Sequence, residues 1–277
     1  MLKVSEFPEK TILRIVVAGR VARAFKYERP VWYKTLSSKR KKKPDWSKSA
    51  ESQRERKTRE RKSAIIRAQN HVFNLVSTNA WFWVKSEGIP YLPVFLTLTF
   101  KENIQDIKES NILFNKFIKR LNYHIGNSKK AFLKYLAVME FQKRGAIHYH
   151  LILFNMEYVY KEAIEKLWSH GFIKIISYDR NDNIAKYLTK YFVKSLDDDR
   201  LDGKKRYFCS KNLKRPLVIN DENKALEIIA HIPEKYITNR RPYESLYHGT
   251  VHTVEYDFGT GKTIGDIIDL ADKQAYS

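Results

Sequence analysis

The sequence predicts an α+β fold with a ferredoxin-like antiparallel sheet, and the order of its apolar patterns is the reason. Segments 94–100, 132–142, 146–154 and 172–178 are rich in β-branched and aromatic residues, which is typical of strands. Helical patterns follow the first and third of these strands, and another helix is predicted over 183–196. The order β-α-β-β-α-β-α is the split βαβ arrangement. We expect two helices on one face of the sheet and the last helix, which carries tyrosines, near the other.

Each predicted helix has a local reason. After "VFLTLTF", apolar side chains recur at helical intervals: Phe114, Phe117, Ile118, Leu121 and Ile125. The next helix, over 158–169, carries Ala163, Leu167 and Trp168 and is stopped by Gly171. The last helix is entered through "NDN", whose side chains can cap its first turn. Between the two middle strands, "KRG" is a short hairpin loop whose glycine can adopt a positive φ.

Around this core the chain divides into four segments. Residues 1–45 are predicted to form N-terminal strands and a basic loop, and 46–80 a basic amphipathic helix. The core occupies 90–200. Residues 201–277 form a C-terminal extension whose role the sequence does not indicate, although 248–258 alternate like a strand.

Charge and composition favour a cytoplasmic protein that binds nucleic acid. The 277 residues are 43% hydrophobic and 13% aromatic, which fits a folded globule. The 52 Lys and Arg exceed the 31 Asp and Glu and give a formal charge of +21, which suits a phosphate backbone. A merely solvated, lysine-rich surface is the alternative explanation. The single cysteine, Cys209, excludes an intramolecular disulfide and a multi-cysteine zinc site. We expect no membrane span and no signal peptide.

Two histidines in the strand 146–154 form the first candidate site. His148 and His150 are two residues apart, so both project from the same face of the sheet and can converge on one divalent ion. If the hairpin loop is 143–145, Glu140 lies directly opposite His148 and becomes a third ligand. A two-residue loop would shift the register and remove Glu140. The alternative for the pair is two structural histidines, bonded to backbone or water.

A tyrosine pair in the last helix, "NIAKYLTKYFVK", is the second candidate. Tyr187 and Tyr191 are one turn apart, on a face with Lys190 and Lys194 and separate from the apolar stripe of the helix. A tyrosine hydroxyl can act as a covalent nucleophile on a phosphate when a divalent ion and lysines offset the negative charge. Attack would release a 3′-hydroxyl and leave the 5′-phosphate on tyrosine. Packing or stacking is the alternative role for the pair.

These motifs together resemble those of the HUH endonucleases, and specifically the rolling-circle replication initiators of small single-stranded DNA phages and plasmids. "FLTLTF" resembles the first motif of that family, "GAIHYHLILF" the second and "YLTKYFVK" the third in its two-tyrosine form. The resemblance implies His148 and His150 as metal ligands, with Glu140 in the place of the third. It implies Tyr187 and Tyr191 as nucleophiles, assisted by Lys190 and Lys194. One tyrosine alone is sufficient in many relatives.

The implied activity is metal-dependent nicking of single-stranded DNA at a replication origin, with Mg²⁺ or Mn²⁺ as cofactor, followed by strand rejoining. A single-strand transposase or mobilisation relaxase uses the same chemistry, and a non-catalytic basic nucleic-acid-binding protein is an alternative of another class. "GTGKT" at 259–263 is not a P-loop, because Tyr256 stands where the upstream glycine is required. A host helicase and polymerase are therefore the expected partners.

Overall fold

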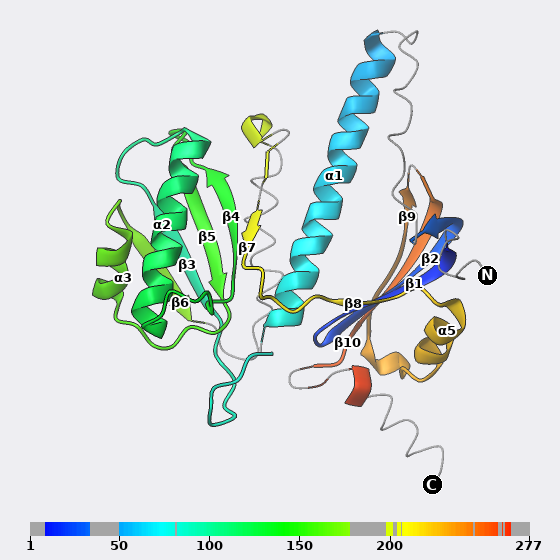
Figure 1. Ribbon diagram of the computed structural model, residues 1–277. Coiled ribbons are helices and arrows are strands. Elements are labelled where there is room, and N and C mark those ends of the chain that lie inside the picture. Colours follow the sequence, from blue (N-terminus) through cyan, green and yellow to red (C-terminus); the bar gives the residue numbers. More distant parts are fainter. Residues whose placement is uncertain are drawn as a thin grey trace, which may run out of the picture. The chain divides into compact units, whose positions relative to one another are not determined.

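The chain folds into two units, each built on a five-stranded antiparallel sheet (Figure 1). One unit comprises Met1–Ala64 and Pro216–Ser277, and the other Ile65–Arg215. The computed structural model describes residues 9–33, 50–80, 82–177, 198–201, 204–205, 207–245, 247–259, 262 and 264–266. In this part of the chain, no helix is long and apolar enough to cross a membrane.

The sheet of unit Ile65–Arg215 has the predicted ferredoxin-like topology. Its strands are β3 (Val94–Thr99), β4 (Tyr135–Phe141), β5 (Ile147–Leu153), β6 (Ile173–Ser177) and β7 (Tyr207–Cys209). Helix α2 (Ile107–Gly126) connects β3 to β4, and α3 (Lys161–Trp168) connects β5 to β6. The spatial order is β6-β3-β5-β4-β7, so the two crossover connections interleave their strands and β7 extends the edge beside β4. The prediction of an α+β fold is confirmed.

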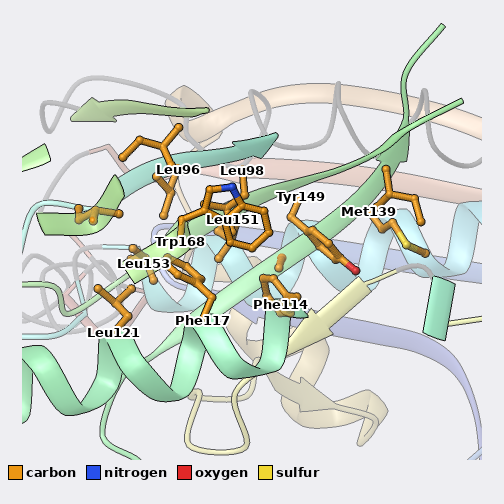
Figure 2. Close-up of a cluster of buried hydrophobic side chains, with 14 of the residues drawn as sticks. Leu96, Leu98, Phe114, Phe117, Leu121, Met139, Tyr149, Leu151, Leu153 and Trp168 are labelled. Atoms are coloured by element: carbon orange, nitrogen blue, oxygen red, sulfur yellow. The ribbon is translucent and has the colours of Figure 1, made fainter. Parts of the chain in front are cut away.

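One face of this sheet packs on α2 and α3 through the largest apolar cluster of the described residues (Figure 2). At its centre the Tyr149 ring stacks on Phe114, with centroids 4.4 Å apart. The Tyr149 hydroxyl is also satisfied, since it donates to the Ser110 Oγ at 3.0 Å. Trp168 at the end of α3 is fully buried, and its Nε1–H donates to the Thr99 carbonyl at 3.1 Å. The alternate residues of β5 are thus committed to the core, which turns the histidines to the opposite face.

The opposite face is covered in part by the second half of α1 (Ala50–Asn79). Val72, Leu75 and Val76 are buried there, in one cluster with apolar residues of the sheet that include Ile152 of β5. Sequence patterns predicted this helix and its apolar stripe but not the surface that it covers. The helix predicted near this face, over 183–196, lies outside the described residues.

The second sheet joins the two ends of the chain. Its order is β8-β1-β2-β10-β9, with β1 (Lys10–Ala18), β2 (Val21–Trp32), β8 (Leu217–Ile219), β9 (Ile237–Ser245) and β10 (Gly249–Asp257). Helix α5 (Glu222–Ala230) packs on one face with an apolar cluster that includes residues of β1, β2 and β10. Short 3₁₀ turns are formed by Asp199–Leu201 and Glu234–Tyr236. The strand pattern at 248–258 therefore pairs with the N-terminal strands.

Candidate active site

The hairpin between β4 and β5 has the register on which the site prediction depends. The Gln142 N–H donates to the Ala146 carbonyl at 2.8 Å, which leaves residues 143–145 as the loop. Counting back from this pair, Glu140 lies directly opposite His148. The three-residue loop, rather than the two-residue alternative, is therefore the one that forms, and Glu140 shares a face with the histidines.

Two residues of the loop explain why this register is held. Gly145 has φ of +89°, a left-handed conformation that glycine adopts without steric cost. Beside it, the Arg144 guanidinium donates to the carbonyls of Phe100 at 2.5 Å and Lys101 at 3.3 Å. The loop is thus tied to the end of β3, and the edge of the candidate site is fixed by hydrogen bonds as well as by strand pairing.

His150 lies at the centre of a hydrogen-bonded row across three strands. It is only 5% exposed, and its ring stacks on Phe95 with centroids 5.8 Å apart. Its Nε2 lies 2.8 Å from Glu140 Oε2, and its Nδ1 lies 3.1 Å from Thr97 Oγ1. A carboxylate can only accept, so Nε2–H donates to Glu140. In the neutral ring Nδ1 then accepts from the Thr97 hydroxyl.

His148 is different, because its Nε2 is buried without a hydrogen-bond partner in the described structure. Burial lowers the pKa of His148 to about 4, His150 and Arg144 lower it as well, and Glu140 acts in the opposite direction. The imidazole is therefore neutral at pH 7 and has a lone pair available. The two histidine rings have centroids 6.3 Å apart. A buried imidazole nitrogen with nothing bonded to it is unusual and is expected to have a ligand.

The chemistry of these donors fits a divalent cation. Two imidazoles and one carboxylate are ordinary ligands, and His148 offers an unsatisfied one. The described residues nevertheless contain no group of three His, Cys, Asp or Glu side chains arranged to hold a metal ion. Glu140 is instead hydrogen-bonded to His150. Metal binding by Glu140, His148 and His150 therefore stays a prediction.

The structure adds polar neighbours that the sequence patterns did not single out. Thr97 is paired with His150 on one side and with Lys174 of β6 on the other, and Lys174 is exposed. On the far side of the row, Tyr207 of β7 pairs with Val138 of β4, which is the partner of His150. Thr97 lies 53 positions from His150 in the chain, and only the three-dimensional register shows that the two residues share a row.

The predicted nucleophile helix falls outside the part of the chain that the structure describes. Tyr187, Tyr191, Lys190 and Lys194 all lie within 178–197, which is not described. Strand β6 ends at Ser177, at the Val94 end of β3. The geometry of the candidate site therefore comes from the sheet residues alone.

Comparison with known proteins gives this face of the sheet a context. Residues 93–196 match the family of replication-associated proteins of the ORF2 type. The matched segment holds the β3–β6 core, Glu140, both histidines and both tyrosines. The chain is also 28% identical over 146 residues to a phasyl DNA replicon protein, arp, of Escherichia coli. That alignment covers 43% of this chain and 49% of the relative, so the chain spans about half the length of the curated relative that it matches. No solved structure matches the chain. The matches support a role in DNA replication.

Proposed function

We propose that the chain is a site-specific single-strand DNA endonuclease that begins rolling-circle replication by nicking an origin. The observation that carries the proposal is the coincidence of two findings in one segment. The replication-associated family match over 93–196 contains a buried, neutral His148 with an unpartnered nitrogen. It also contains the Glu140–His150 pair on the same sheet face.

In this proposal Glu140, His148 and His150 hold Mg²⁺ or Mn²⁺. A divalent cation at this place supplies charge that offsets the oxygens of the scissile phosphate. His148 needs no change of protonation to act as a ligand, because its depressed pKa keeps it neutral. For His150 the Thr97 hydroxyl is the neighbour that can accept a proton carried on Nδ1, which leaves Nε2 free to bind.

The chemical step is assigned to Tyr187 or Tyr191. The phenolic oxygen forms a bond to phosphorus as the bond from phosphorus to the 3′ oxygen breaks, and the phenolic proton is lost while the 3′ oxygen gains one. Lys190 and Lys194 would stabilise the phenolate and the phosphate oxygens. The products are a free 3′-hydroxyl and a 5′-phosphotyrosine, and the reverse attack by a 3′-hydroxyl rejoins a strand without a nucleotide cofactor.

A replication role rather than transposition is favoured by the family that matches and by the name of the relative, a DNA replicon protein. The basic composition of the chain, with a formal charge of +21, suits a DNA substrate. A host helicase and polymerase would open and copy the duplex after the nick.

The decisive experiment is covalent capture. The full chain is incubated with Mn²⁺ and labelled single-stranded fragments that tile the replicon encoding it, and the products are separated on a denaturing gel. We expect one fragment to yield a DNA-linked protein band that the double variant Tyr187→Phe/Tyr191→Phe does not form. The matched control is Tyr158→Phe/Tyr160→Phe, which alters two exposed tyrosines outside the site and should leave the band unchanged.

Absence of a covalent band with every fragment, at low salt and with Mn²⁺ or Mg²⁺, would contradict the proposal. A band that survives in the Tyr187→Phe/Tyr191→Phe variant would contradict the assignment of the nucleophiles alone.

A further inference from the structure

The two faces of the β8-β1-β2-β10-β9 sheet differ in composition. Ala22 and Ala24 of β2 point to the apolar cluster that α5 covers. The alternate residues of the same strand, Arg23, Phe25 and Tyr27, point to the opposite face. That second face carries large aromatic and basic side chains where a covered sheet would carry aliphatic ones, and we call it the aromatic–arginine face.

Strand register places these side chains in rows that cross the sheet. Phe25 is paired with Arg14 of β1 and with Thr253 of β10, and Thr253 is paired with Arg241 of β9. The adjacent row runs from Tyr27 through Val251 to Tyr243 in the same way. Residues from the two ends of the chain therefore form one surface: Arg14, Arg23, Phe25, Tyr27, Arg241 and Tyr243.

The side chains of this face alternate stacked rings and guanidinium groups. Phe25 and Tyr27 are stacked, with centroids 6.3 Å apart and planes 12° from parallel. The guanidinium carbon of Arg14 lies 6.0 Å from the centroid of the Tyr27 ring, and that of Arg23 lies 5.9 Å from the centroid of Phe25. The rings are thus held in fixed orientations by cation–π contacts before any ligand arrives.

The face is accessible and its charge is positive. Tyr243 is 44% exposed, Arg241 is exposed, and Phe25 and Tyr27 are half-buried. Burial lowers the pKa of Arg23, and Arg241 lowers it as well, although Glu255 acts in the opposite direction. The three arginines outnumber the one carboxylate that faces Arg23, so an anion laid across the rows would relieve the repulsion between Arg23 and Arg241.

We propose that the aromatic–arginine face binds single-stranded DNA, with unpaired bases stacked on Phe25, Tyr27 and Tyr243 and phosphates on Arg14, Arg23 and Arg241. Aromatic rings that alternate with arginines across a sheet supply the two contacts that a single strand needs, a stacking platform and a cationic track. In a duplex the base faces are already stacked on one another, so this surface selects unpaired strands. The proposal concerns unit Met1–Ala64 with Pro216–Ser277 and does not depend on nicking by the other unit.

The test is fluorescence anisotropy with the full chain and labelled oligothymidine of about 20 nucleotides, longer than the roughly 4–16 nucleotides that one such surface covers. Tyr243→Ala should weaken binding about tenfold, as expected for the loss of one stacked base. Arg241→Ala should lower the slope of log affinity against log salt by about 0.7, the value for one phosphate contact on a single strand. Tyr243→Phe, which keeps the ring, should bind like wild type and shows that position 243 tolerates substitution.

The matched control is Arg240→Ala. Arg240 is exposed on the same strand as Arg241, but it points to the opposite face and is ion-paired with Glu234 at 2.8 Å. Its loss removes the same charge and should leave the affinity and the salt slope unchanged. Equal losses in Arg240→Ala and Arg241→Ala, wild-type affinity in Tyr243→Ala, or equally tight binding of duplex DNA or oligouridine would each overturn the proposal.

The outcome is separable from that of the nicking proposal. A chain that binds oligothymidine through Tyr243 but forms no covalent band sustains the second DNA surface and refutes the endonuclease. A chain that forms the band while its binding ignores Tyr243 and Arg241 does the reverse.

Discussion

Replacing Thr97 with valine tests whether the row Thr97–His150–Glu140 supports a metal site. Valine keeps the β-branched shape that suits β3 and removes only the hydroxyl that lies 3.1 Å from His150 Nδ1. When His150 binds a cation through Nε2, its proton must reside on Nδ1, where the Thr97 hydroxyl would accept it. Hydrogen-bond partners of metal-binding histidines are typically worth about 10–100-fold in metal affinity or activity, so we expect Thr97→Val to weaken Mn²⁺ binding by a factor in that range.

The same substitution has a smaller effect on folding. One hydrogen bond between neutral groups contributes about 1 kcal/mol, and His150 is almost fully buried, so the free energy of unfolding should fall by about 1 kcal/mol. Mn²⁺ affinity is measured by isothermal titration calorimetry and stability by urea unfolding in EDTA. Thr238→Val serves as the control, because Thr238 donates a comparable hydrogen bond to the Glu255 carbonyl in the other unit.

A folded Thr97→Val variant with wild-type Mn²⁺ affinity would refute this reasoning. It would show either that His150 does not bind the cation or that it binds with Nε2 still donating to Glu140. His148→Ala would then be needed to decide whether Mn²⁺ binds this face at all.

Three further predictions concern the fold around the site. Asn122→Leu should lower the free energy of unfolding by roughly 2–4 kcal/mol in urea, because its Oδ1 accepts from two backbone N–H groups of residues 132–133 and its loss leaves both unpaired; a loss below about 1 kcal/mol would contradict this. Gly171→Ala should cost roughly 2–4 kcal/mol in the same assay, because φ is +149° and a Cβ would collide with the Thr99 carbonyl oxygen; a neutral effect would argue against the close approach. His148→Gln should flatten the pH dependence of stability in EDTA: burial first, then His150, lowers the pKa from 6.5 to about 4, so the unfolded chain takes up the proton first and wild type loses stability as pH falls through this interval. Equal slopes for wild type and variant would refute the buried, neutral state.

The hairpin was predictable because its determinants are local. Gly145 and the alternation of apolar residues on both strands specify one register over a short stretch of chain, and the pairing of Glu140 with His148 follows from it. The apolar spacing of α2 similarly predicts which residues are buried, and Phe114, Phe117 and Leu121 are all in the core. These inferences succeed because a period and a turn are enough to determine them.

Contacts between distant segments could not be predicted in the same way. Thr97 joins the row of His150 only because β3 pairs with β5 in one register, and no local pattern specifies that register. The second sheet is a stronger case, since Ile15 pairs with Ile219 and Phe25 with Thr253. The sequence identified strand patterns in both terminal regions but contained no periodic signal that they belong together, and so the aromatic–arginine face was not foreseen.

The row also makes metal binding and covalent chemistry separable. Thr97, His150 and Glu140 come from three paired strands whose alternate residues are buried in the α2–α3 core, so the proposed ligands are positioned by the sheet and do not require the tyrosine segment. Mn²⁺ affinity should therefore be unchanged in Tyr187→Phe/Tyr191→Phe, although the covalent band is lost. If the tyrosine variant also lost Mn²⁺ binding, one of its hydroxyls would have to contribute to the cation site, and the division between a rigid ligand platform and a separate nucleophile would be wrong.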